Sequence, residues 1–294
     1  MGPSLFNFFL NDLLFPSTEF SIANYADDTT IVVTASNEDL LLNNLSSATN
    51  VAINWFKENS MQANPAKFQF ITFGCTTTNL RIDENTYLEN NDCVKLLGIQ
   101  LDRKLNFKCQ ISTLCRKAAW QLCALKRIGK YISQDARMAI FRSFISSNLS
   151  YSNIVWHFFS KLCSKKIEKI QERGLRIVFH DYVSTYEKLL ESSKLKSVKE
   201  CRLQCLVLEV FKARRGLSPS YIEELFTSKT TPYDLHRKDQ LIITQKRTVT
   251  YGLKSFAHVG AKIWNKLPNE LKDAKTVHNF KSGLQNIDIL SLLG

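Results

Sequence analysis

Long apolar runs are missing from this sequence of 294 residues. No stretch approaches the roughly 18 consecutive apolar residues of a membrane-spanning helix. The apolar start, residues 5–15, has no basic residue before it and contains Asn7, Asn11 and Asp12, which does not fit a secretory signal peptide. We therefore expect a soluble, intracellular protein of the nucleus or cytoplasm that has no membrane partner.

The sequence also lacks the cysteine and glycine patterns of several common sites. Its eight cysteines form no Cys-x-x-Cys pair, and no histidine stands at the spacing typical of a zinc site. Its ten glycines include no phosphate-binding loop, and no Ser/His/Asp order stands out. A zinc site, a nucleotide switch and a serine hydrolase therefore have no support in the sequence.

Charge is distributed unevenly along the chain, whose net charge is +12. Residues 1–60 contain one basic and seven acidic residues, whereas residues 101–180 contain sixteen basic and four acidic residues. An acidic segment that could bind cations, followed by a basic one, suits an enzyme that handles a phosphate backbone, because Lys and Arg release the counterions of nucleic acid. A helical domain with solvated lysines explains the composition as well.

Two adjacent carboxylates, Asp27 and Asp28, follow Tyr25-Ala26 between two segments that favour β-structure. Apolar residues alternate before the pair, and a run rich in β-branched residues follows it, so we expect a β-hairpin with the carboxylates at its turn. Magnesium is held by one or two carboxylates together with substrate phosphates, and two such ions can clamp a phosphoryl transfer. The alternative is an ordinary solvated turn.

The spacing of apolar residues predicts an α+β fold whose first hundred residues are mixed and whose later part is helical. We expect a helix from Ser36, as its cap, to about Asn59, with Leu41, Leu45 and Trp55 facing the sheet. Strands are predicted at residues 68–73, 80–82, 86–88 and 95–101. Helices are predicted around an apolar stripe from Ile111 to Leu125, and at residues 134–145, 163–179 and 198–214. In the helix at 134–145, Ala136, Ile140 and Phe144 should point inward.

Four ordered motifs resemble the reverse transcriptases of non-LTR, jockey-like retrotransposons over nearly the whole chain. They are Gly2-Pro3-Ser4-Leu5-Phe6 with Asn11-Asp12-Leu13, Tyr25-Ala26-Asp27-Asp28, Asn64-Pro65-Ala66-Lys67 with Phe73, and Leu97-Gly98 with Asp102 and Leu105. The resemblance implies part of a right-hand polymerase palm, an antiparallel hairpin and strands with covering helices, in residues 1–106. An α-helical, basic thumb or connection region would follow in 107–230, and a small C-terminal tail in 231–294.

The resemblance also implies roles for individual residues. Asp27 and Asp28 would be the catalytic, metal-binding pair for two Mg²⁺ ions in the intact parent, with Asp27 as the direct ligand. Tyr25 would lie beneath the primer end. Lys67 would lie near the phosphates of the incoming nucleotide, although a surface lysine at the start of a strand is an equal alternative.

The basic helices are expected to hold the RNA template and the DNA primer, because the family's thumb does so. The residues concerned are Arg116, Lys117, Lys126, Arg127, Lys165, Lys166, Lys169, Arg173 and Arg176. Tyr151, Trp156 and His157 could stack on bases, with core packing as the alternative. The tail resembles a recurring tail of the same proteins at Lys254-Ser255-Phe256 and at Trp264-Asn265 with Leu267-Pro268.

The resemblance therefore predicts a fragment of an RNA-directed DNA polymerase. In the family, a further metal-binding aspartate on an earlier palm strand, the fingers and an endonuclease come before this portion, and we expect the upstream DNA to encode them. Alone, the chain should be inactive because that aspartate is missing. The rival readings are a non-catalytic nucleic-acid-binding remnant and a translated fragment without a role.

Overall fold

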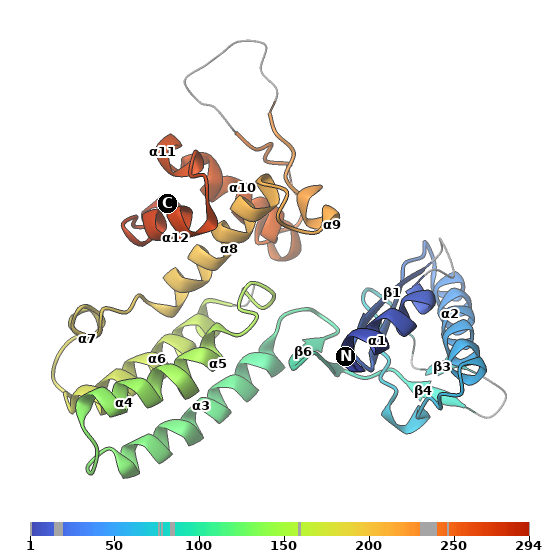
Figure 1. Cartoon of the computed structure of the whole chain (residues 1–294), viewed down its shortest axis with the longest axis horizontal. Helices are drawn as coiled ribbons and strands as arrows, with labels where there is room; N and C mark the ends of the chain where they lie inside the picture. The colour runs from blue at the N-terminus through green and yellow to red at the C-terminus, as the bar shows by residue number, and fades with distance from the viewer. Residues whose placement is uncertain are drawn as a thin grey trace. The chain divides into compact units, whose positions relative to one another are not determined.

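A computed structural model describes residues 2–14, 20–75, 77, 79–82, 86–157, 160–229, 240–245 and 247–293. The chain divides into two compact units, residues 1–105 and 106–294 (Figure 1). The first unit combines helices with two-stranded sheets, and the described part of the second is almost entirely helical. The fold class is therefore α+β, as the sequence predicts.

The described residues of the first unit form three pairs of antiparallel strands and one long helix. Its helices are α1 (Gly2–Phe9), the 3-10 helix η1 (Leu10–Leu14), α2 (Glu38–Glu58) and the 3-10 helix η2 (Pro65–Lys67). Its strands are β1 (Phe20–Tyr25), β2 (Asp28–Val33), β3 (Asn79–Arg81), β4 (Tyr87–Glu89), β5 (Cys93–Leu96) and β6 (Ile99–Asp102), which pair as β1–β2, β3–β4 and β5–β6.

Helix α2 covers one face of the β1–β2 hairpin. Ala48 and Ala52 on α2 are buried, and their small side chains let the helix lie close to the strands. Asn37 caps the helix by accepting a hydrogen bond from the backbone N–H of Leu40 at 2.8 Å, so the cap is one residue after the predicted Ser36. The predicted hairpin and its covering helix are thus confirmed.

Residues 68–73 do not form the predicted strand. Phe70 makes only an isolated parallel bridge to Asn90. The backbone N–H of Phe70 donates to the side chain of Asn91 at 3.2 Å, and that of Thr72 donates to the side chain of Asn90 at 3.2 Å. Two asparagine amides from a distant segment therefore take the bonds that a neighbouring strand would provide.

The predicted strand at 95–101 is a hairpin instead. Leu97 and Gly98 both have positive φ, 45° and 85°, and they join β5 to β6. Two consecutive residues with positive φ form the type I′ turn that suits the twist of a tight hairpin. Gly98 adopts this conformation without steric cost, so it ends the apolar run that suggested one strand.

The second unit begins with long helices packed side by side (Figure 1). These are α3 (Lys108–Ile128), α4 (Gln134–Ile140) continued by the π-helical turn η3 (Phe141–Ser146) and α5 (Ser147–Ser150), and α6 (Lys161–Phe179). The predicted stripe of α3 is buried at all five positions, Ile111, Leu114, Ala118, Leu122 and Leu125. No helix among the described residues is long and apolar enough to cross a membrane.

The inward face predicted for residues 134–145 is wrong at Phe144, whose side chain is 59% exposed. The buried residues of this segment are Arg137, Phe141 and Ile145, so the buried face is offset by one residue from the predicted one. The offset is already present at Arg137, before the π-helical turn at 141–146. Phe141 packs against Gly174 of α6 so closely that a Cβ on that glycine would lie 2.2 Å from the phenyl ring.

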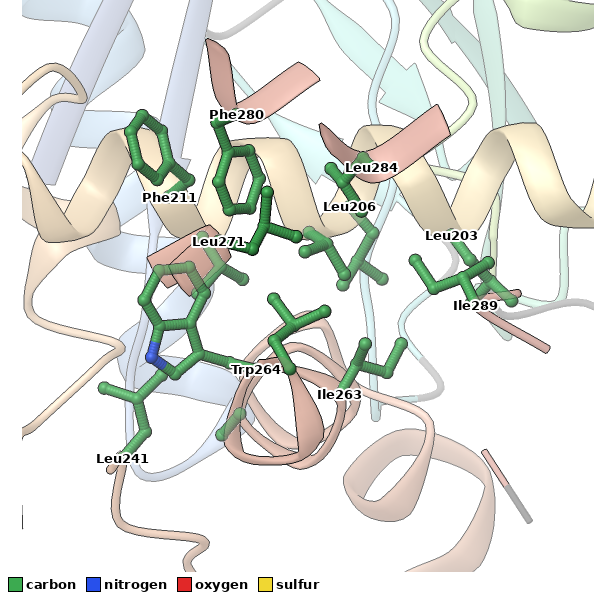
Figure 2. Packing of buried hydrophobic residues seen from close by; sticks show 14 of the residues in the cluster. Leu203, Leu206, Phe211, Leu241, Ile263, Trp264, Leu271, Phe280, Leu284 and Ile289 are labelled. Atoms are coloured by element: carbon green, nitrogen blue, oxygen red, sulfur yellow. The ribbon is translucent and has the colours of Figure 1, made fainter. Parts of the chain in front are cut away.

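The rest of the second unit packs around one long helix. Its elements are α7 (Tyr186–Ser193), α8 (Val198–Arg214), α9 (Ser220–Glu223), the π-helical η4 (Val249–Leu253), α10 (Phe256–Lys266), α11 (Asn269–Lys272), α12 (Val277–Gln285) and the 3-10 helix η5 (Ser291–Leu293). Phe211 of α8 stacks on Phe280 at 4.2 Å between ring centroids, and Trp264 lies beside them (Figure 2).

The tail motifs have structural explanations that the sequence did not supply. Ser255 caps α10, and Phe256 packs edge-on against Phe226 at 5.2 Å. Trp264 is 1% exposed, and the side chain of Asn265 both accepts from Leu241 N at 2.8 Å and donates to Leu241 O at 2.9 Å. The recurring Trp-Asn pair thus joins the core of the tail to the segment at 240–245.

Candidate active site and nucleic-acid interface

Asp27 and Asp28 lie at the tight turn between β1 and β2. Tyr25 pairs directly with Asp28 across the two strands, and Ala26 adopts a left-handed backbone with φ of 53°. This conformation is uncommon for a residue with a Cβ. Both aspartates are exposed to solvent, and so is Tyr25, at 68%. The turn therefore projects two carboxylates and a phenol away from the body of the unit.

The two faces of this hairpin differ in character. Cross-strand partners point to the same side of a sheet, so Ser21, Ala23 and Tyr25 share the outer face with Val32, Thr30 and Asp28. Ile22 and Ile31 pair on the opposite face, which is turned toward α2. Small side chains on the outer face leave Tyr25 and Asp28 accessible to a large ligand.

Asn24 is a feature of the hairpin that the sequence analysis overlooked. It pairs with Thr29 on the inner face, next to Tyr25. Its side-chain oxygen and nitrogen are both buried, and neither has a hydrogen-bond partner among the described residues. An unsatisfied buried amide costs about 1–3 kcal/mol. The strand that leads to the carboxylates therefore carries a local destabilising group.

The donors fit a hard cation only in part. Carboxylate oxygens are the ligands that Mg²⁺ takes from proteins, usually together with substrate phosphates. Within the described residues, no cluster of three or more His, Cys, Asp or Glu could hold a metal ion. Lys67, exposed at the end of η2, makes no ion pair with Asp27 or Asp28 among these residues. The pair thus supplies two ligands and no complete site.

The second candidate surface is basic and lies on α3 and α6, which contact each other. Helix α3 contains five basic residues and no acidic one. Arg116, Lys117, Lys126 and Arg127 are exposed on α3, and Lys165, Lys166, Lys169 and Arg173 are exposed on α6. Burial raises the pKa of the Cys115 thiol on α3, and the charge of Lys166 on α6 opposes this rise.

The acidic residues of α6 do not neutralise this surface. Glu168 accepts hydrogen bonds from Tyr186 Oη at 2.8 Å and from the backbone N–H groups of Val198 and Lys199, so it caps α8. Glu172 pairs with Arg176 at 2.7 Å. Of the nine cations predicted to bind nucleic acid, Arg176 alone has an ion-pair partner among the described residues.

Trp156, which the sequence left open between base stacking and core packing, lies in the core. Its side chain is fully buried, its indole N–H donates to Tyr151 O at 2.9 Å, and Arg202 lies over the ring at 5.6 Å. His157 is also largely buried, and desolvation with nearby Arg202 and Lys199 lowers its pKa to about 4. Core packing, the alternative reading, therefore holds for Trp156.

Trp120 was overlooked. It lies on α3, on the side opposite the buried stripe, and is 73% exposed. The signal was available in the sequence, because position 120 falls between Ala118 and Leu122 and therefore on the other face of a helix.

The acidic turn lies within the part of the chain that matches a known family. Residues 1–101 match the family described as reverse transcriptase (RNA-dependent DNA polymerase). A curated relative, the RNA-directed DNA polymerase from mobile element jockey of Drosophila melanogaster, is 25% identical over 195 residues. The match covers 60% of this chain and 20% of the relative, so the chain spans about a fifth of that protein's length. No solved structure matches. The motifs, the exposed Asp pair at a hairpin turn and both matches agree: the chain is similar to the reverse transcriptases of mobile elements such as jockey.

Proposed function

We propose that this chain is the palm-to-thumb portion of a polymerase that copies RNA into DNA with two Mg²⁺ ions. Residues 1–106 would form part of the palm, 107–230 the thumb or connection, and 231–294 a tail packed on the thumb. The observation that carries the proposal is the exposed pair Asp27–Asp28 at a tight antiparallel turn, within the residues that match reverse transcriptases.

Within this proposal, Asp27 and Asp28 would bind Mg²⁺, which brings together the nucleophile and the leaving phosphate oxygens in such enzymes. Asp27 would be the direct ligand and Asp28 would support it. Tyr25, beside Asp28 on the open face of the hairpin, would contact the primer end. Lys67 would face the phosphates of the incoming nucleotide. RNA template and DNA primer would be the partners.

The basic surface of α3 and α6 would hold the template and primer through their phosphates. The residues are Arg116, Lys117, Lys126, Arg127, Lys165, Lys166, Lys169 and Arg173, whose charges are not offset by acidic partners among the described residues. Arg176 would contribute less than these, because the Glu172 carboxylate lies 2.7 Å from its guanidinium. Such contacts are independent of sequence and sensitive to salt.

A second function is favoured by a specific observation. Because the described residues offer two adjacent carboxylates and no third ligand, catalysis by this chain alone should be absent. The chain would then act as a nucleic-acid-binding remnant, with the basic surface functional and the Asp pair inactive.

Primer extension on an RNA template, with Mg²⁺ or Mn²⁺, tests these functions. The isolated chain should incorporate no more nucleotide than a double variant, Asp27→Ala with Asp28→Ala. Metal-dependent incorporation that exceeds this control would show that the chain carries a complete site, and it would refute the remnant reading.

A further inference from the structure

Helix α3 presents one large aromatic side chain to solvent. The chain has four tryptophans. Trp156 and Trp264 are at most 1% exposed and Trp55 is half-buried, whereas Trp120 is 73% exposed. An indole in water loses the free energy that its burial would provide. A cost of this kind on a well-formed helix suggests a ligand for the ring.

The neighbours of Trp120 on the helix surface define the chemistry of that ligand. Arg116 is four residues before Trp120 and Arg127 is seven residues after it, so all three lie on one line of the helix. Lys117 lies three residues before it, and the exposed Cys123 and Ala124 that follow are small. Cations therefore lie before and after the ring along the helix, small residues lie between the ring and Arg127, and the helix carries no acidic residue.

Cations together with an exposed aromatic ring favour a polyanion that carries flat apolar groups. Nucleic acid satisfies both conditions, because phosphates pair with Arg and Lys while a base stacks on an aromatic ring. A base inside a duplex is already stacked on both faces, whereas an unpaired base has a free face that can lie on Trp120. The phosphates on either side of it would meet Arg116 and Arg127.

We propose that Trp120 is a stacking platform for an unpaired base, and that α3 binds single-stranded nucleic acid through Trp120, Arg116 and Arg127. This inference rests on the proposed function and deepens it, because it assigns Trp120, Arg116 and Arg127 of α3 to the single-stranded part of the substrate. The cations of α6 then remain for the backbone of the duplex. The bound strand is RNA or DNA, since stacking uses a π-face that every base has.

Equilibrium binding of the full chain to 12-nucleotide oligo(U), 12-nucleotide oligo(dT) and a blunt RNA–DNA hybrid tests the proposal. Stacking on one ring should make Trp120→Ala bind the single strands about five- to a hundredfold more weakly. Binding of the hybrid should stay within about twofold, and the salt slope for the single strands should not change, because no charge is removed. Trp120→Phe should restore part of the affinity.

Tyr221→Ala is the matched control, because it removes another exposed aromatic ring, 67% exposed, from a short helix that bears an acidic residue. Tryptophan emission supplies a second readout: oligo(dT) should quench the wild type and leave Trp120→Phe unaffected. Equal affinities of wild type and Trp120→Ala for both single strands would overturn the proposal. So would a change from dimer to monomer in Trp120→Ala without loss of oligonucleotide affinity. If the wild type binds none of the three ligands, the proposed function itself fails.

Discussion

The hydrogen bonds of Arg137 allow us to predict how much its replacement lowers the free energy of unfolding. This residue of α4 is 8% exposed and donates three hydrogen bonds to backbone carbonyls. Its Nε donates to Val178 O at 2.7 Å, and its Nη1 donates to Gly129 O at 2.9 Å and to Ile132 O at 2.8 Å. Val178 is near the end of α6, and Gly129 follows α3 directly. One side chain thus satisfies carbonyls at the ends of two helices.

Replacing Arg137 by Met keeps the aliphatic stem and removes the donors. Hydrogen bonds to a charged group contribute about 1.5–3 kcal/mol each, and carbonyls left unsatisfied in the interior add a penalty. Desolvation of the guanidinium in the folded wild type offsets part of this loss. We expect Arg137→Met to lower the free energy of unfolding by about 3 kcal/mol.

Urea denaturation followed by tryptophan fluorescence measures this change, because Trp156 and Trp264 are buried in the same unit. Arg142→Met is the matched control, since Arg142 is exposed and donates a single bond of 3.3 Å to Ser193 O. It should change the free energy of unfolding by no more than about 0.5 kcal/mol. The reasoning is refuted if Arg137→Met costs less than about 1 kcal/mol, or no more than Arg142→Met does.

Two further predictions concern stability. The pKa of His157 is lowered from 6.5 to about 4 in the folded chain. As pH falls, the unfolded chain therefore binds a proton at this histidine before the folded chain does, and the folded chain loses stability between pH 6.5 and pH 4. Between pH 7 and 5 the free energy of unfolding of the wild type should fall by about 2 kcal/mol more than that of His157→Gln, as measured by urea titrations at each pH. The same pH dependence of this free energy in both proteins would contradict the prediction. Asn24→Val should raise the free energy of unfolding by about 1 kcal/mol, because it removes a buried amide without partners among the described residues and adds a β-branched side chain. Ser21→Val, on the outer face of the same strand, should change it by less than about 0.5 kcal/mol, and equal effects of the two variants would count against the burial argument.

Local patterns were sufficient for the elements in which apolar residues recur at a regular spacing. The β1–β2 hairpin follows from alternation around Asp27 and Asp28, and α3 follows from its apolar stripe. The cap of α2 differed by one residue, because Asn37 and Ser36 both carry a side-chain acceptor suited to an N-cap.

Errors arose where distant residues or an unusual turn decide the structure. The bonds from Asn90 and Asn91 to residues 70–72 come from about twenty positions away, so no local pattern announces them. Phe144 is exposed because the buried face of its segment runs through Arg137, Phe141 and Ile145, one residue away from the predicted face. The hairpin within 95–101 was missed because Leu97 and Gly98 form a tight turn inside an apolar run. For the candidate site, the carboxylate pair could be predicted at a turn from the sequence. Only the structure shows that Arg176 pairs with Glu172 and that the amide of Asn24 is buried.

The salt dependence of hybrid binding tests the central claim, that the basic surface of α3 and α6 binds the nucleic-acid backbone. If about five phosphates are neutralised, the logarithm of the affinity for an RNA–DNA hybrid should fall with the logarithm of salt concentration with a slope of about −4 to −5. Changing Lys165, Lys166 and Lys169 together to Gln should flatten that slope by up to ~3 units. Changing the exposed Lys254, Lys275 and Lys281 of the tail to Gln removes the same charge and should leave the slope within about one unit of the wild type. Equal slopes for the wild type and the α6 variant, or equal flattening in both triple variants, would contradict the claim.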